Sequence, residues 1–278
     1  MGHALVLGGG GVAGIAWEIG LLAGLDEAGV TVRDADLVVG TSAGSAVAAQ
    51  LASGLPLAEL LARQVDPAKQ APEIAADIDM EKMAQLFGLE QAPADRAALR
   101  RQICRIALLA ETVSEADRHA VIEARVPVDA WPDGQRVLIV AVDANTGEER
   151  VFDRDSGVGL VDAVAASCAV PAVWPPVTIG DTRYVDGGVR SAENADLAAG
   201  HEVVLVLQAM AMEGVTDLED QVESLRSQGS TVLVVTPDAE VLAAMGANPL
   251  DPAVRTPTAT AAQRQGAALA TEIAAFWR

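Results

Sequence analysis

Three short glycine-rich segments carry the residue types that ester chemistry requires. The segment Gly40–Gly44 has the pattern G-x-S-x-G, directly after the apolar run Leu37–Val39 and before a helix-like stretch. A strand that runs into this pattern and then into a helix is typical of a nucleophile elbow, whose serine sits in a strained turn with an exposed hydroxyl. We therefore predict that Ser42 is a nucleophile, and that side chains at Gly40 and Gly44 would collide with neighbouring elements.

The second segment is Asp186-Gly187-Gly188, which follows the strand-like run Thr182–Val185. A serine hydroxyl is a weak nucleophile and needs a base within hydrogen-bonding reach. Asp186 is the candidate base, because its carboxylate would take the proton of Ser42 during attack on an ester carbonyl and return it to the leaving alcohol. Gly187 and Gly188 are expected to support this turn. Without the serine pattern, an ordinary turn after a strand would explain the same three residues.

The third segment is the glycine run that follows the predicted strand Ala4–Leu7. Its backbone N–H groups can donate to an oxyanion, and we predict Gly9, Gly10 and Gly11 as the donors. Gly14 is expected to support the same motif. The helix after the serine would also direct its N-terminal N–H groups towards the developing negative charge.

The same glycine run has a rival interpretation as a dinucleotide site. Gly9–Gly14 satisfies G-x-G-x-x-G between a strand and a helix, and Asp34 lies about 20 residues further on, where the ribose-binding acid is expected. That acid normally ends a second strand. Here Val30–Val32 is very short, and Asp34 precedes the strong strand Leu37–Val39, which ends in the serine motif. An NAD(P)- or flavin-binding oxidoreductase of the Rossmann type therefore remains an alternative function.

A Ser–His–Asp triad is the alternative to a dyad. The order Ser42, Asp186, His201 matches the chain order of α/β-hydrolases. However, His201 precedes the predicted strand Glu202–Leu207, whereas Ser42 follows its own strand, and in a parallel sheet these positions lie at opposite edges. The other two histidines lie in a helical stretch and at the start of the first strand, so we favour a dyad without histidine.

In this order, the three segments resemble those of the patatin-like phospholipases, which are serine acyl hydrolases with a Ser–Asp dyad. A fourth segment, Ala166–Pro176, is similar to that family's A-S-x-A-x-P-x-x-F-P-P stretch, and the resemblance covers roughly residues 3–210. It implies a lipid acyl hydrolase that forms an acyl–Ser42 ester from a phospholipid, a lysophospholipid or a simple ester. The chain departs from the family at Ala13, where the glycine loop usually has Arg or Lys. A catalytically silent lipid-binding relative is therefore a second alternative.

Composition limits the partners and the compartment. The 278 residues carry a formal net charge of −20, so neither nucleic acid nor an anionic membrane surface is an expected electrostatic partner. A lipid substrate would arrive as monomers or through transient apolar contact with a membrane or micelle. The chain starts in a strand rather than a signal-type segment, and no apolar run approaches ~20 residues, so we expect a cytoplasmic protein.

Cys104 and Cys168 are expected to be reduced packing residues. No group of potential ligands has metal-binding spacing, so we expect no metal or organic cofactor.

The order of predicted elements indicates a three-layer α/β/α fold with a mostly parallel central sheet, formed by residues 1–278 as a single domain. The expected strands are 4–7, 37–39, 136–142, 149–152, 177–179, 182–185, 202–207 and 231–235. The expected helices are 14–28, 45–52, 55–64, 160–168 and 257–276, the last with Thr256 as its N-cap. Residues 66–126 are predicted to form a helical, amphipathic insertion, which either caps an acyl pocket or packs on the sheet in the ordinary way.

Several side chains near the motifs are expected to have structural roles. Asn194 either orients the loop after Asp186 or caps the next helix. Ser45 and Ser167 are predicted to pack and to cap, and Trp174 is predicted to lie in the core rather than to line an acyl pocket.

Overall fold

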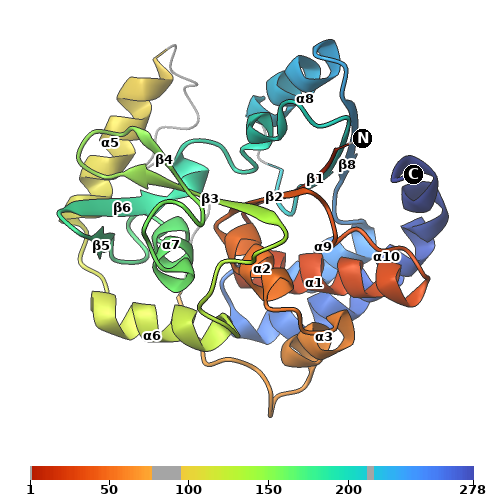
Figure 1. The fold of residues 1–278 in the computed structure, drawn as a ribbon. Helices are drawn as coiled ribbons and strands as arrows, with labels where there is room; N and C mark the ends of the chain where they lie inside the picture. Colours follow the sequence, from red (N-terminus) through yellow and green to blue (C-terminus); the bar gives the residue numbers. More distant parts are fainter. Residues whose placement is uncertain (1, 77–94, 212–215) are drawn as a thin grey trace.

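A computed structural model describes residues 2–76, 95–211 and 216–278, in which a central sheet lies between layers of helices (Figure 1). The eight strands of these residues form one sheet in the order β5-β6-β3-β2-β1-β7-β8, with β4 paired to β3 beside this path. The strands are β1 His3–Leu7, β2 Leu37–Thr41, β3 Arg136–Asp143, β4 Glu149–Phe152, β5 Val177–Ile179, β6 Thr182–Asp186, β7 Val203–Leu207 and β8 Thr231–Val235.

The sheet has a parallel part and an antiparallel part. Strands β3, β2, β1, β7 and β8 pair in parallel, whereas β4 and β6 run antiparallel to β3, and β5 runs antiparallel to β6. The mostly parallel sheet predicted from the sequence is therefore confirmed. The carboxyl ends of the parallel strands meet at one edge, which is where open α/β sheets place their binding sites.

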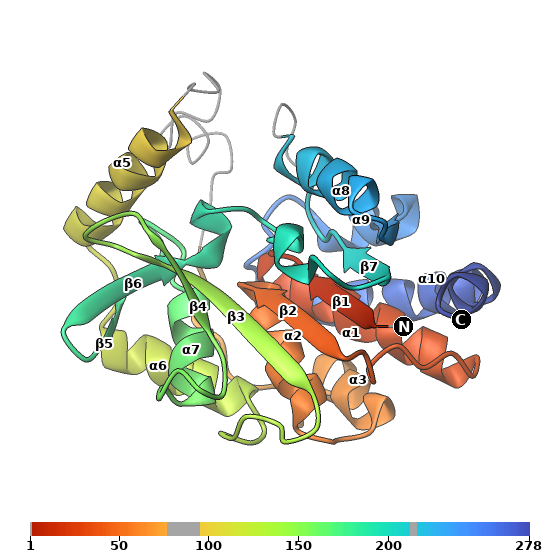
Figure 2. The same ribbon diagram turned by 45° about the horizontal axis from the view of Figure 1, so that its top comes forward.

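Helices cover both faces of the sheet, as Figure 2 shows for α8 on one side and α1 and α2 on the other. The helices are α1 Gly11–Glu27, α2 Ala43–Ala52, α3 Leu57–Val65, α5 Arg96–Leu109, α6 Glu115–Arg125, α7 Leu160–Ser167, α8 Asp217–Ser227, α9 Ala239–Met245 and α10 Arg255–Phe276. Short 3-10 turns are η2 Gly187–Val189, η3 Ala195–Ala198 and η4 Pro252–Val254.

The two faces are buried because side chains alternate along each strand. On β1, Leu5 and Leu7 belong to a large core cluster that also includes side chains of α1, α2, α7 and α10. Ala4 and Val6 point to the other face, where a smaller cluster includes side chains of α8 and η3. The three-layer arrangement therefore follows from strands that are apolar on both sides.

Helices α1 and α10 pack at backbone distance because glycines meet there. A Cβ placed on Gly24 would lie 2.1 Å from the Gln263 carbonyl oxygen, and one on Gly266 would lie 2.1 Å from the Leu21 carbonyl oxygen. This close packing joins the second half of α1 to α10.

Several predicted boundaries were wrong. Helix α1 begins at Gly11 rather than at residue 14, and α3 spans 57–65 rather than 55–64. Helix α10 begins at Arg255, so Thr256 is not its N-cap. The Thr256 hydroxyl instead lies 3.3 Å from the Gln64 carbonyl oxygen, which accepts its hydrogen bond, and the side chain is thereby used to join α10 to α3.

The predicted helical insertion at 66–126 is only partly helical. Residues 66–76 form turns and irregular backbone, whereas α5 and α6 provide the helices. Residues 77–94 of the insertion lie outside the described residues. Pro67 and Pro72 remove backbone donors from the irregular part, which is one physical reason for the missing helix.

Candidate active site

Ser42 occupies the strained turn expected of a nucleophile elbow. It lies between the last residue of β2 and the first residue of α2, with φ 52° and ψ −112°. This left-handed conformation is rare for a residue with a side chain. A Cβ on Gly40 would lie 2.7 Å from the Gly44 carbonyl oxygen, and one on Gly44 would lie 2.1 Å from the Leu7 carbonyl oxygen. The predicted collisions are confirmed, and they explain why both positions are glycine.

The peptide groups of Ser42 are held by the end of α7. The Ser42 N–H donates to the Ser167 hydroxyl over 2.9 Å, and the Ser42 carbonyl oxygen accepts from the Ser45 hydroxyl over 2.6 Å. The Cys168 thiol donates to the same carbonyl oxygen over 3.1 Å, and burial raises the pKa of this thiol. Ser167 is therefore more than the packing and capping residue that we predicted, because its hydroxyl fixes the backbone of the predicted nucleophile.

Asp186 reaches the same edge of the sheet from β6. This strand pairs with β3, which is the direct neighbour of β2. A Cβ on Gly187 would lie 2.3 Å from the Val140 carbonyl oxygen of β3, so only glycine allows the turn to pack there. The Asp186 Oδ1 atom accepts a hydrogen bond of 2.7 Å from the Gly188 N–H. These contacts fix the carboxyl group before any substrate binds.

The Asp186 carboxyl group is buried and faces Ser42. Burial raises the pKa of Asp186 to about 7, while the Gly188 N–H and then the Ser42 hydroxyl lower it. The Oδ2 atom makes no hydrogen bond within standard geometry to any described residue. One carboxylate oxygen is therefore anchored and the other is available to a proton, and the fold brings together the two side chains that the sequence singled out.

Asn194 links the loop after Asp186 to the elbow strand. Its amide nitrogen donates to the Thr41 hydroxyl over 2.9 Å and to the Ser191 carbonyl oxygen over 2.7 Å. Its amide oxygen accepts from the Arg190 guanidinium over 2.6 Å. Of the two predicted roles for Asn194, orientation of the loop is confirmed, and capping is wrong because its side chain caps neither η3 nor another helix start.

The glycine loop passes directly beside the elbow. A Cβ placed on Gly9 would lie 3.6 Å from the Ser42 Cβ, and the Gly44 N–H donates to the Gly8 carbonyl oxygen over 3.0 Å. The Gly9 N–H already donates to the Ala192 carbonyl oxygen over 2.8 Å. Among the described residues, no backbone acceptor takes the N–H groups of Gly10 or Gly11. Two of the three predicted oxyanion donors are therefore free in this conformation.

Gly14 and Ala13 lie where the loop becomes helix α1. A Cβ on Gly14 would lie 3.1 Å from the Ala43 Cβ, so Gly14 allows α1 to approach the start of α2. Ala13 is buried, and its N–H donates to the Pro249 carbonyl oxygen over 2.9 Å. The position where the resemblance leads one to expect a basic residue is thus filled by a small side chain inside the core.

The geometry does not favour the dinucleotide alternative. Asp34 lies in a turn before β2 rather than at the carboxyl end of a strand. A Cβ on Gly11 would lie 2.4 Å from the Leu250 side chain, so the segment after α9 already covers this part of the loop. The ribose-binding acid that the fingerprint requires therefore has no equivalent here.

The three histidines lie away from the Ser–Asp pair. His119 is paired with Asp162 over 2.8 Å, and the His3 ring packs on Trp277 with centroids 4.9 Å apart. His201 precedes β7, and its ring lies 3.3 Å from where a Cβ of Gly2 would be, at the amino edge of the sheet. The prediction that these histidines do not complete a triad agrees with their positions.

Two buried carboxyl groups beside the glycine loop were not predicted from the sequence. Glu18 of α1 is fully buried, and burial raises its pKa well above the usual range. Burial also raises the pKa of Glu193 to about 7, and a Cβ on Gly8 would lie 3.4 Å from the Glu193 Cγ. Glu18 is the one charged residue in the stretch from Gly11 to Leu25 of α1, which is a signal that the sequence alone contains.

Other predicted features were also located. Both cysteines are free and buried, as expected, and Trp174 is a core residue with 3% of its surface exposed. Across residues 2–76, 95–211 and 216–278, no helix combines the length and the apolar character that a membrane crossing requires. The same described residues contain no group of three or more His, Cys, Asp or Glu side chains arranged to hold a metal ion.

Comparison with known proteins places this site in a family. The family model described as "Patatin-like phospholipase" matches residues 5–199, which include all three glycine-rich segments. No curated protein is similar enough in sequence to match the chain.

Three solved structures match most of this chain at low sequence identity. VipD from Legionella pneumophila is 13% identical, with a TM-score of 0.48, over 98% of this chain and 66% of VipD. The type III effector protein ExoU is 15% identical, with a TM-score of 0.37, over 95% of this chain and 53% of ExoU. ExoU from Pseudomonas aeruginosa in complex with SpcU is 16% identical, with a TM-score of 0.34, over 96% of this chain and 52% of that chain.

The chain thus spans two thirds or less of the length of these proteins. Because the family model covers well over half of the sequence, the chain belongs to the patatin-like phospholipases, a family of lipid-hydrolysing enzymes.

Proposed function

We propose that this protein hydrolyses carboxylic esters of lipids with a Ser42–Asp186 dyad and without a cofactor. The observation that carries the proposal is the buried Asp186 carboxyl group, which faces the Ser42 hydroxyl and keeps its Oδ2 atom without another partner. A base is most effective when its pKa lies near the working pH, and burial raises the pKa of Asp186 to about 7.

The proposed reaction has two halves. The Ser42 Oγ atom attacks the ester carbonyl carbon while its proton passes to Asp186 Oδ2, and the tetrahedral intermediate then expels the alcohol, which takes that proton. The product of this half is an acyl–Ser42 ester. Water then attacks the acyl carbon, gives its proton to Asp186, and releases the fatty acid as Ser42 regains its proton.

The negative charge of the tetrahedral intermediate needs donors. The N–H groups of Gly10 and Gly11 support this role, because the loop lies beside Ser42 and no described backbone acceptor uses them. The N–H of Ala43, the first residue of α2, is a further candidate, because the residue after the nucleophile supplies a donor in other elbow hydrolases. Gly9 is not proposed as an oxyanion donor, because its N–H already donates to the Ala192 carbonyl oxygen.

The substrate class follows from the family and is a phospholipid, a lysophospholipid or a simpler ester. The formal net charge of −20 argues against electrostatic docking on an anionic bilayer. We therefore expect monomeric or micellar lipid to be accepted more readily than lipid in anionic vesicles.

The test is covalent labelling of the full chain with a fluorophosphonate ester, followed by intact mass and peptide mapping. We expect one adduct on Ser42, which Ser42→Ala abolishes. Ser227→Ala, an exposed serine at the end of α8, is the matched control and should label like the wild type. An absence of adduct on folded wild-type protein would refute the activated serine and would favour the silent lipid-binding relative.

A further inference from the structure

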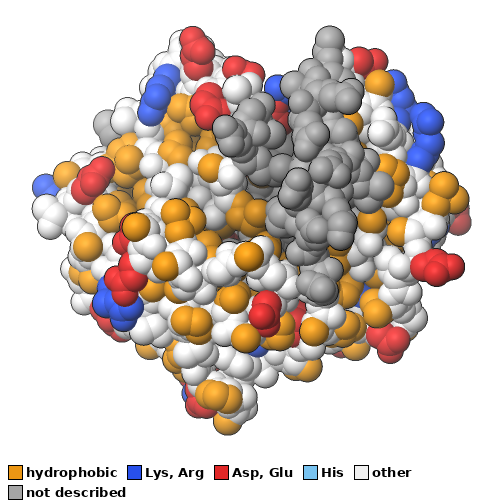
Figure 3. Space-filling model, turned by 180° about the vertical axis from the view of Figure 1, so that it is seen from behind, with side chains coloured by type: hydrophobic (Ala, Val, Ile, Leu, Met, Phe, Trp, Pro, Cys, Tyr) orange, Lys and Arg blue, Asp and Glu red, His pale blue; other side chains and the backbone are white. Residues whose placement is uncertain are grey.

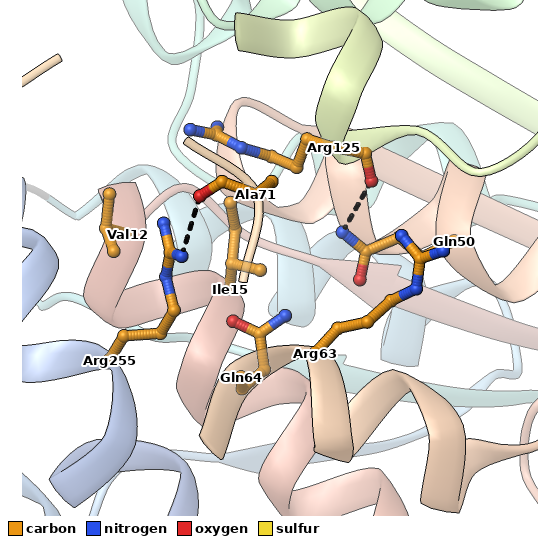
Figure 4. A pocket seen from close by; sticks show the side chains of 8 residues that line it. All are labelled: Val12, Ile15, Gln50, Arg63, Gln64, Ala71, Arg125 and Arg255. Carbon is orange, nitrogen blue, oxygen red and sulfur yellow. Dashed lines mark hydrogen bonds between the residues drawn. The ribbon is translucent and has the colours of Figure 1, made fainter. Parts of the chain in front are cut away.

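A small pocket between five helices, separate from the Ser–Asp pair, is lined by arginines (Figure 4). Arg63 of α3, Arg125 of α6 and Arg255 of α10 line it together with Gln50 of α2 and Val12 of α1. The cavity volume is about 20 Å³, which is room for one water-sized group. Arg63 is half-buried, whereas Arg125 and Arg255 are buried, so the pocket combines a buried end with a more accessible side.

The positive charges around this pocket exceed the negative ones. Arg118 of α6 does not line the cavity but lies near Arg125, and its side chain stacks on Trp174 with 4.0 Å between the guanidinium carbon and the ring centroid. Glu73 is the one carboxylate among the described residues that pairs with this group. It contacts Arg118 over 2.6 Å and also pairs with Arg125. One buried acid therefore serves several buried cations.

Arg255 forms no ion pair with a carboxylate among the described residues. Its guanidinium donates to the Ala71 carbonyl oxygen over 3.0 Å, and only 5% of the residue is exposed. Burial and then the charge of Arg125 lower the pKa of Arg255, while the charge of Glu73 raises it. A buried cation without a paired carboxylate is costly, so an anion that enters the pocket would relieve this cost.

Gln50 supplies a second, independent sign of a missing ligand. The residue is 2% exposed, and its amide nitrogen donates to the Arg125 carbonyl oxygen over 3.2 Å. Its amide oxygen has no hydrogen-bond partner among the described residues. Unpaired buried acceptors are rare in native proteins, so this oxygen calls for a donor group.

The arginine pocket lies close to the Ser–Asp pair. Val12 directly follows the predicted oxyanion donors, Gly10 and Gly11. The charges of Arg125 and Arg118 also act on the Cys168 thiol, which donates to the Ser42 carbonyl oxygen. A ligand in the pocket would therefore lie on the same side of the molecule as the elbow.

The pocket differs from the rest of this acidic molecule. The formal net charge is −20, and on the face shown in Figure 3 the Lys and Arg side chains lie mostly towards the margins. Three guanidiniums around one small cavity are therefore not a general property of the chain.

We propose that the arginine pocket binds a phosphate group. Phosphate carries more than one negative charge and accepts forked hydrogen bonds from several guanidiniums at once, which fits the excess of cations. Its protonated form also carries a hydroxyl that can donate to the unpaired Gln50 oxygen. The cavity volume of about 20 Å³ has room for one phosphate oxygen.

The phosphate can come from the head group of a lipid substrate or from the free ion. Binding of the ion does not depend on the proposed function, whereas a head-group role rests on it. The experiment below therefore has two arms, of which only the second requires ester hydrolysis.

The first arm is calorimetric titration of the full chain with inorganic phosphate at constant ionic strength. We expect binding by the wild type and at least about tenfold weaker binding by Arg63→Gln and Arg255→Gln. Arg154→Gln, which removes an exposed arginine paired with Asp133, should bind like the wild type. Arg63 has no hydrogen bond or ion pair among the described residues, so Arg63→Gln should fold even if the buried Arg255 variant does not.

The second arm compares kcat/KM for a lysophospholipid with a terminal phosphate and for a neutral monoacylglycerol with the same acyl chain. A fall of about tenfold in this ratio for Arg63→Gln assigns the pocket to the head group. An unchanged ratio with weakened phosphate binding assigns it to free phosphate. If the folded wild type binds no phosphate, or if Arg63→Gln binds as tightly, the proposal is overturned. If no ester is hydrolysed, the proposed function fails while the first arm still decides the pocket.

Discussion

The Ser–Asp pair and the arginine pocket both bury charge, but with opposite balances. At the elbow, Asp186 is a buried carboxyl group that forms no ion pair among the described residues, and burial raises the pKa of Asp186 to about 7. In the pocket, Glu73 neutralises only part of the charge of Arg118, Arg125 and their neighbours. Burial without a counter-charge therefore has two uses: it can tune a base, and it can prepare a site for an anion. Neutralising the buried carboxyl group should consequently have opposite effects on stability in the two regions.

The largest expected effect is on activity. Asp186→Asn keeps the shape of the side chain but cannot take the Ser42 proton, so kcat should fall by about 10²- to 10⁴-fold. In the wild type, kcat/KM should rise with pH through about 7, because the base must be ionised and burial raises the pKa of Asp186 to about 7. Initial rates of ester hydrolysis between pH 5 and 9 measure both.

The matched control for this substitution is Asp181→Asn, in the exposed hairpin turn between β5 and β6. It should leave both kcat and the pH profile unchanged. An Asp186→Asn variant with near-normal kcat would show that Asp186 is not the base. The contrast between the Ser–Asp pair and the arginine pocket would then have no basis in catalysis.

The next effect concerns Glu73. Replacement by Gln leaves Arg118 and Arg125 buried without their carboxylate, and breaking a buried ion pair costs about 3–5 kcal/mol. The free energy of unfolding in urea should fall by that amount. Glu59→Gln, which removes an exposed partner of Lys69, should cost about 0–1 kcal/mol. Equal losses of unfolding free energy for the two substitutions would mean that Glu73 does not offset the buried charge of Arg118 and Arg125.

The arginine pocket was beyond prediction from the sequence, and the reason is physical. Arg63, Arg125 and Arg255 lie far apart in the chain, and on a helix each has the character of an ordinary surface arginine. Only the packing of α3, α6 and α10 brings them around one cavity. Burial of a charged side chain is a property of the tertiary structure, and no local pattern encodes it.

The elbow was predictable because its constraints are local. A serine between two glycines after a buried strand specifies a strained turn, and the collision at Gly40 with the Gly44 carbonyl oxygen follows from that turn. The collision at Gly44 is a tertiary contact with Leu7 of the neighbouring strand. The parallel strands were predictable because each contains a contiguous apolar run. The errors lie where tertiary contacts override local preference, as at Thr256, whose hydroxyl joins α10 to α3 instead of capping a helix.

A third prediction concerns the pH dependence of stability. The pKa of Asp186 is about 7 in the folded chain and near 3.8 in the unfolded chain, so folding favours the protonated form. This contribution is full below about pH 4 and is lost as the pH rises to about 7. Asp186→Asn escapes that loss, so relative to wild type its free energy of unfolding should increase by about 2–4 kcal/mol between pH 4 and pH 8.

Urea unfolding of both proteins at the two pH values measures this difference. The Asp186→Asn variant should still lose some stability as the pH rises, because burial also raises the pKa values of Glu18 and Glu193. An Asp186→Asn variant that is less stable than wild type at pH 8 would show that the carboxyl group stabilises the fold. The elbow would then resemble the Glu73 cluster rather than contrast with it.

The smallest expected effect tests whether the elbow depends on fixed backbone as well as on charge. Ser167→Ala leaves the buried Ser42 N–H without its acceptor, which should cost about 1 kcal/mol of stability and about fivefold in kcat, with KM little changed. Ser227→Ala removes an exposed hydroxyl that bonds to the Ser224 carbonyl oxygen and should change neither quantity. The pH profile should keep its midpoint near 7, because Ser167 contacts the peptide of Ser42 and not the Asp186 carboxyl group. A shifted midpoint would instead mean that the hydroxyl of Ser167 acts on the base, and that charge rather than backbone geometry governs both regions.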